Sequence, residues 1–186
     1  MKIPIWSRRS FLKAAMVGTM LLLARPSFAS EMIEEEKMAE GRLLLYHTRT
    51  GEKLDVTYRD SGGKYDEGAL SAINHILRCH HNDEEIDMDV RVIEYLNTVD
   101  KSLGGDNLIH VISGYRSKEY NEMLRRRSRR VARHSLHLTG QAVDLRIPGV
   151  SLKKIKKTAM SMRFGGVGYY PRANFVHLDS GSFRYW

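Results

Sequence analysis

The chain has 186 residues, of which 42% are hydrophobic and 28% are charged, and its formal net charge at pH 7 is +8. This length suits one domain with an apolar core, and the composition excludes a fully disordered chain and an integral membrane protein. Five of the excess positive charges lie in residues 1–29, which contain no acidic side chain, so the remainder carries only +3. We therefore expect no nucleic-acid partner.

The first 29 residues have the order of an export signal. The paired Arg8 and Arg9 precede an apolar stretch, residues 14–24, which leads to small residues around Ala29. This stretch is too short for a membrane span, which needs ~20 residues. With the paired arginines, the segment resembles a twin-arginine signal, which the twin-arginine export machinery recognises. We expect cleavage after Ala29, no stable membrane insertion afterwards, and a single periplasmic domain over residues 30–186.

The first half of this domain predicts a hairpin followed by two helices. Residues 42–48 and 53–59 flank an Arg-Thr-Gly turn and have the composition of paired strands. Asp66 is a candidate N-cap for a helix over residues 67–80, where apolar residues recur at helical spacing. A second amphipathic helix fits residues 88–99. The only cysteine of the chain, Cys79, lies near the end of the first of these helices, so we expect no internal disulfide. We also expect a monomer.

The second half alternates strands and helices. Residues 108–113 predict a buried strand, residues 118–130 a helix with a strongly basic face, and residues 142–147 a strand that ends at a Pro-Gly pair. A helix over residues 151–162 then leads to two closing strands within 165–170 and 174–181. The sum predicts an α+β fold with helices packed on a mainly antiparallel sheet. We expect the terminal Trp186 to seal its core.

Three side chains in this pattern suit a metal. Zinc is bound by imidazole nitrogen and carboxylate oxygen, and catalytic sites use three protein ligands with one position left open. His137 and Asp144 lie seven residues apart, and His177 stands alone in an apolar strand. Gly140 permits a tight turn between the first two, and period-two alternation along the strand directs Asp144 back toward His137. The sequence therefore predicts that these three residues hold Zn²⁺.

The spacing of these residues also resembles the motif of a known enzyme family. Residues 135–144 match in full the SxHxxGxAxD signature of zinc peptidases related to D-alanyl-D-alanine carboxypeptidases. FVHLDSG, residues 175–181, is similar to the second histidine strand of that superfamily, and SGYRS, residues 113–117, to its substrate-side loop. The similarity covers roughly residues 105–180. It implies a hedgehog and D-Ala-D-Ala peptidase type of fold and, in the murein endopeptidase branch, hydrolysis of peptidoglycan stem-peptide cross-links, including those between two diaminopimelate residues.

The catalytic base is the open question of this resemblance. Relatives often place a glutamate three residues before the second histidine ligand, but here that position is Asn174, which cannot accept a proton. Asp179 is the candidate base, because it shares a strand face with His177. Its alternative role is to accept the second imidazole N–H of His177 and so orient the ring. His134 is a further candidate base.

Three more residues are candidates for contact with substrate. Arg116 is expected to stabilise the developing oxyanion or to bind a substrate carboxylate through its planar guanidinium group. Its alternative is a solvated turn residue. Ser113 is expected to help position the peptide, and Ser135 is expected to bind the substrate.

Two further points stay open at the level of sequence. The arginine run from Arg125 to Arg133 is either a solvated helix face or a surface that attracts the anionic cell wall. The activity has two alternatives to a zinc endopeptidase. One is a D-alanyl-D-alanine carboxypeptidase, and the other is a non-catalytic wall-binding module that keeps zinc for structure.

Overall fold

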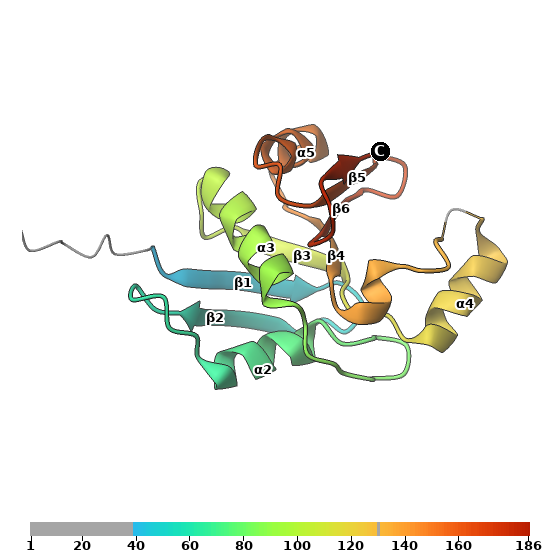
Figure 1. Cartoon of the computed structure of the whole chain (residues 1–186), viewed down its shortest axis with the longest axis horizontal. Coiled ribbons are helices and arrows are strands. Elements are labelled where there is room, and N and C mark those ends of the chain that lie inside the picture. Colours follow the sequence, from blue (N-terminus) through green and yellow to red (C-terminus); the bar gives the residue numbers. More distant parts are fainter. Residues whose placement is uncertain (1–38, 130) are drawn as a thin grey trace, which may run out of the picture. The chain divides into compact units, whose positions relative to one another are not determined.

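The computed structural model describes residues 39–129 and 131–186 (Figure 1). Within these residues a seven-stranded sheet has the order β2-β1-β3-β4-β6-β5-β7. The strands are β1 (Gly41–His47), β2 (Lys53–Arg59), β3 (Leu108–Ser113), β4 (Ala142–Arg146), β5 (Gly166–Tyr170), β6 (Phe175–Asp179) and β7 (Arg184–Tyr185). The helices are α2 (Glu67–Ile76), α3 (Val90–Ser102), α4 (Lys118–Arg127), the 3-10 turn η1 (Leu136–Thr139) and α5 (Leu152–Ser161).

The α+β fold class predicted from the sequence is confirmed. Four of the strand pairs are antiparallel, β1 with β2, β3 with β4, and β6 with both β4 and β5. The pairs β1 with β3 and β5 with β7 are parallel. The proposed export signal lies outside the described residues. No helix in the described part has the length and apolar character needed to cross a bilayer.

Two helices end earlier than the sequence predicts. The first helix stops at Ile76 instead of residue 80, because the Leu77 carbonyl accepts a hydrogen bond from the Tyr115 amide at 2.7 Å. α4 stops at Arg127, where Ser128 turns to an extended backbone. The short strand β7 was not predicted, since its two residues form a strand only by pairing with β5.

One face of the sheet packs against α2, α3 and α5 and forms the core. Alternate strand residues point to this face, so each strand contributes every second side chain. The core strand residues are Leu43, Leu45, Ile109, Val111, Val143, Leu145, Val167, Val176 and Leu178. Each contributes roughly 1.5–3 kcal/mol when fully buried. The intervening residues of β4 and β6 point to the opposite face, where the candidate site lies.

His47, the last residue of β1, is expected to make stability fall in mild acid. Its side chain is fully buried, and its Nδ1 accepts hydrogen bonds from the Arg49 and Thr50 amides at 3.3 and 3.2 Å. Burial, helped by the nearby His80, lowers the pKa of His47 from 6.5 to about 4. Between these values the unfolded chain binds a proton that the folded chain does not. The contribution of His47 to the free energy of unfolding is therefore fully present above pH 6.5 and is lost toward pH 4. The loss amounts to at most ~3 kcal/mol.

The variant His47→Asn tests this expectation, because the asparagine oxygen can still accept from the two amides but does not titrate. Urea unfolding at a series of pH values should give a shallower decline between pH 6.5 and 4 for the variant than for the wild type. Parallel curves would show that His47 is not the group responsible.

Candidate metal centre

Strand register places two of the predicted ligands side by side. Asp144 of β4 and His177 of β6 are direct antiparallel partners, and Ser113 of β3 is paired with Asp144 on its other side. These three side chains therefore form a row across three strands. All three are buried.

His137 reaches the row from outside the sheet. It lies in η1, which follows Ser135 and ends at Gly140, whose φ of 66° is in the left-handed region that favours glycine. A Cβ at Gly140 would also lie 2.9 Å from the Asp87 carbonyl oxygen. The His137 Nδ1 donates to the Gly114 carbonyl at 2.7 Å, so Nε2 is left free of hydrogen and faces the row.

The three ligand-type atoms converge. His137 Nε2 lies 3.2 Å from Asp144 Oδ1 and 3.2 Å from His177 Nδ1, and His177 Nδ1 lies 2.8 Å from Asp144 Oδ1. Tetrahedral zinc ligands at about 2.0–2.2 Å from the metal lie roughly 3.4 Å from one another, so the donor set fits zinc in type and spacing. Within residues 39–129 and 131–186 no other group of three His, Cys, Asp or Glu meets the same geometric condition.

Burial and the neighbouring charges shift the pKa values of these three side chains in opposite directions. Burial lowers the pKa of His137. For His177, burial favours the neutral ring, but the Asp144 and Asp179 carboxylates outweigh it and raise its pKa to about 9. Although burial alone would raise the pKa of Asp144, the two imidazoles lower it below its ordinary value. Asp144 is therefore held as a carboxylate, the form that binds a metal.

Arg116 is anchored at the same row. It follows β3, and its backbone N–H donates to the His137 carbonyl at 3.0 Å. Its guanidinium group contacts Asp144 Oδ2 and Ser113 Oγ, each at 3.3 Å, and Asn121 Oδ1 at 3.4 Å. The Nε atom is buried without a hydrogen-bond partner in the described part of the chain. Arg116 is thus a buried cation beside the ligands, which disagrees with the alternative of a solvated turn residue.

Asp179 lies behind His177, and both of its oxygens are already engaged. Oδ2 is 3.0 Å from His177 Nε2 and accepts from Arg184 at 2.7 Å. Oδ1 accepts from Arg184 and from the Gly166 and Gly181 amides at 2.9–3.1 Å. A Cβ at Gly166 would lie 2.2 Å from Asp179 Oδ2, so glycine makes room for this arrangement. The residue is fully buried, and burial is outweighed by His177 and Arg184, which lower its pKa to about 2.

A cleft of about 380 Å³ opens onto the three ligand-type residues. His134 and Ser135 line one part of it, and an aromatic wall lines another. The wall consists of Tyr170, Phe175 and Trp186. A larger and more open hollow of about 510 Å³ lies over α2 and β2. It contains none of the predicted site residues, so we take the smaller cleft as the candidate site.

Trp186 does not seal the core, contrary to the prediction from sequence. It is 46% exposed, its backbone pairs with β5, and its ring lies 5.4 Å from the His177 ring. Strand pairing therefore holds it at the cleft, where its Nε1 donates to the Tyr170 hydroxyl at 2.7 Å. Asn174 is exposed in the β5–β6 turn and does not line this cleft.

Sequence reasoning missed Arg184. It lines the cleft, forms a double hydrogen bond with Asp179 and lies over the Trp186 ring at 5.1 Å. The residues next to Arg184 in the sequence form no motif that would indicate a functional position. The glycines at 165, 166 and 168 were an available signal, because glycines inside a strand often mark a close approach of another segment.

Fold and site together define the class, an α+β protein with a candidate metal centre of two imidazoles and one carboxylate open to a cleft. Residues 36–186 match the family model described as peptidoglycan L,D-endopeptidase MepK. The chain is 39% identical over 165 residues to the peptidoglycan L,D-endopeptidase MepK of Escherichia coli strain K12, covering 89% of this chain and 88% of that protein. It is 40% identical over 147 residues, 78% of each chain, to the probable peptidoglycan L,D-endopeptidase MepK of Haemophilus influenzae.

The chain therefore belongs to the MepK family of peptidoglycan L,D-endopeptidases. The family resemblance inferred from the sequence motifs is confirmed.

Proposed function

We propose that this protein is a zinc-dependent endopeptidase that hydrolyses peptide cross-links of peptidoglycan, including the 3-3 links between two diaminopimelate residues. The observation that carries the proposal is the convergence of His137 Nε2, Asp144 Oδ1 and His177 Nδ1 at 2.8–3.2 Å on the floor of an open cleft. The names of the relatives support the substrate class.

His137, Asp144 and His177 would hold the metal. When bound, it would supply Lewis acidity toward the scissile carbonyl and a hydrolytic water that ionises near pH 7. The protein's own contribution is to fix the three donors before the metal arrives. The Gly114 carbonyl fixes the tautomer of His137, and Asp179 orients His177 from behind.

Arg116 would act on the substrate, and Ser113, which does not line the cleft, would position Arg116. Arg116 is buried beside Asp144 and also lines the cleft, which supports a role for its charge in stabilising an oxyanion on the scissile carbonyl. Ser113 holds the guanidinium group in place. Ser135 also lines the cleft, and its side chain makes no capping bond to η1, so its hydroxyl is available to the peptide.

For the base, the geometry favours His134 over Asp179. Asp179 is fully buried, does not line the cleft and already binds Arg184 and two backbone amides. His134 is exposed and lines the cleft one residue before Ser135. We therefore assign Asp179 the orienting role and His134 the transfer of protons.

The replacement His134→Asn is expected to lower kcat by ~100-fold or more, because general acid–base catalysis typically contributes 10²–10⁴-fold. Zinc content should stay at the wild-type level, since His134 is not a ligand. A variant with wild-type kcat would remove His134 from the mechanism.

The activity itself is tested with purified muropeptide dimers of defined linkage. The mature protein is incubated with 3-3 and 4-3 cross-linked dimers, with added zinc or with chelator, and monomers are measured by chromatography. Zinc-dependent conversion of 3-3 dimers supports the proposal. Release of free alanine from monomeric pentapeptides without dimer cleavage would indicate a carboxypeptidase instead, and the absence of any hydrolysis with zinc would favour a non-catalytic module.

We further propose that residues 1–29 are a twin-arginine signal, that the mature protein is a periplasmic monomer, and that it does not remain in the membrane. Replacement of both Arg8 and Arg9 by lysine is the direct test. Retention of the precursor in the cytoplasm supports the assignment, and normal export of the variant contradicts it.

A further inference from the structure

A strongly basic segment lies next to the cleft and has no role in the proposed metal centre. We call residues 118–129 and 131–135 the arginine arm. It comprises α4 and the stretch that leads to η1. Its arginines at 125, 126, 127, 129 and 133 are all exposed, and none forms an ion pair with another described residue. By contrast, six arginines elsewhere are paired with carboxylates.

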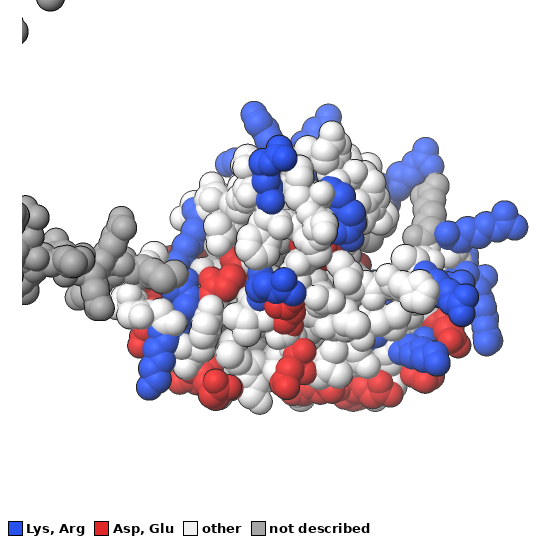
Figure 2. All heavy atoms as spheres, viewed as in Figure 1, with Lys and Arg blue, Asp and Glu red and all other residues white. Residues whose placement is uncertain are grey.

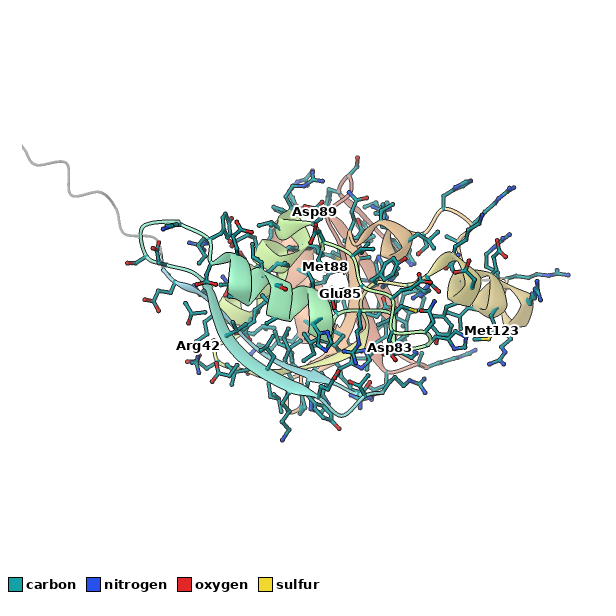
Figure 3. All side chains as sticks on the ribbon, turned by 90° about the horizontal axis from the view of Figure 1, so that it is seen from below. Arg42, Asp83, Glu85, Met88, Asp89 and Met123 are labelled. Atoms are coloured by element: carbon teal, nitrogen blue, oxygen red, sulfur yellow. The ribbon has the colours of Figure 1, made fainter. Side chains whose placement is uncertain are left out.

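The arm projects from the body of the protein. Among the side chains of α4 only Asn121 is buried, and no residue of the helix belongs to the apolar core. Figure 3, which labels Met123 on this helix, shows α4 standing away from the body with long side chains extended into solvent. Figure 2 shows Lys and Arg gathered at this end and acidic residues along the lower edge. Packing therefore does not explain the charge of the arm.

The arm is joined to the cleft by its second half. Val131, Ala132 and His134 line the same cleft as the three ligand-type residues. Asn121 connects the two parts, since it donates to the Ala132 carbonyl at 3.1 Å and accepts from Arg116 at 3.4 Å. A polymer that lies along the arm would therefore continue into the cleft.

We propose that the arginine arm binds the carboxylates of neighbouring peptidoglycan stem peptides and so holds the polymer while one cross-link occupies the cleft. This inference rests on the proposed function. Arginine is suited to it, because its planar donors match carboxylates and stay charged at any physiological pH. A membrane surface is a poorer partner. Helices that lie on a bilayer need an apolar face, and none of the exposed large apolar residues in the described part belongs to the arm.

The test measures binding without cleavage. The mature protein is sedimented with isolated sacculi in the presence of chelator, so the result does not depend on whether the protein is a peptidase. The variant R125Q/R126Q/R127Q is compared with the control K153Q/K154Q/K157Q. The control removes the same charge from exposed positions of α5, a helix that does not line the cleft. Both sets keep good helix formers.

The arm variant is expected to bind sacculi about tenfold more weakly, and the α5 variant within about twofold of the wild type. Amidation of the carboxyl groups of the sacculi should weaken binding of the wild type. The remaining affinity should equal that of the arm variant for untreated sacculi. High salt should reduce wild-type binding toward the same level. Equal losses in both triple variants, or undiminished binding to amidated sacculi, would overturn the proposal. Arm-dependent binding to phosphatidylglycerol vesicles with none to sacculi would also overturn it and indicate a membrane.

Discussion

The substitutions His137→Ala, Asp144→Ala and His177→Ala are each expected to abolish zinc retention and to lower cleavage of cross-linked dimers at least ~1000-fold. Each removes one of three donors that lie 2.8–3.2 Å apart. A metal contributes several kcal/mol of transition-state stabilisation, which corresponds to this loss of rate. Zinc is measured by elemental analysis after dialysis, and cleavage by chromatography of the products.

Stability needs its own control for these variants. Asp144→Ala leaves the buried Arg116 without its carboxylate, and breaking a buried ion pair typically costs 3–5 kcal/mol. Asp144→Asn keeps the shape of the side chain and is the better test of ligation alone. His81→Ala removes an exposed histidine that does not line the cleft and should match the wild type in both assays. A folded His177→Ala variant with a full zinc complement would contradict the assigned ligand set.

The sequence was sufficient to predict most strands and to single out the three side chains that converge at the cleft, because both follow from local patterns. The spacing of His137 and Asp144 and the alternation of β4 depend on neighbours within a few residues. The position of His177 beside Asp144 depends instead on the register between β4 and β6. Periodicity does not specify register between strands that are distant in the chain, so the sequence placed His177 in a strand but could not give its partner.

The positions of the residues around His177 were predictable only in part, because they also depend on pairing between strands that are distant in the chain. Trp186 is apolar enough to suggest a core position, yet its pairing with β5 places it at the cleft. Arg184 is brought to Asp179 by the same two-residue strand. Whether Asp179 acts as base or as orienting group depends on what else its oxygens bind. That information lies in the tertiary structure and not in its distance from His177 along the strand.

The substitution Asp179→Asn is expected to weaken zinc binding by 10–100-fold while leaving most of kcat at saturating zinc. Carboxylates that orient a histidine ligand typically contribute this much to metal affinity. Here Asp179 Oδ2 lies 3.0 Å from His177 Nε2 and thereby directs Nδ1 toward Asp144. Zinc affinity is measured by competition with a chromophoric chelator, and kcat with dimer substrate at several zinc concentrations.

Arg184 provides the matched comparison, because it contacts Asp179 and not the three ligand-type residues in the described structure. Arg184→Ala should weaken zinc binding in the same direction but less, and Arg184→Lys should recover part of the loss. If Asp179 were the base, Asp179→Asn would instead lose 10²–10⁴-fold in kcat with unchanged zinc affinity, and Arg184→Ala would not share that pattern. Measurements of zinc affinity and of kcat therefore distinguish an orienting role of Asp179 from a role as catalytic base. Four donors besides His177 already occupy the Asp179 oxygens, so a proton taken from the cleft would have to displace one of them.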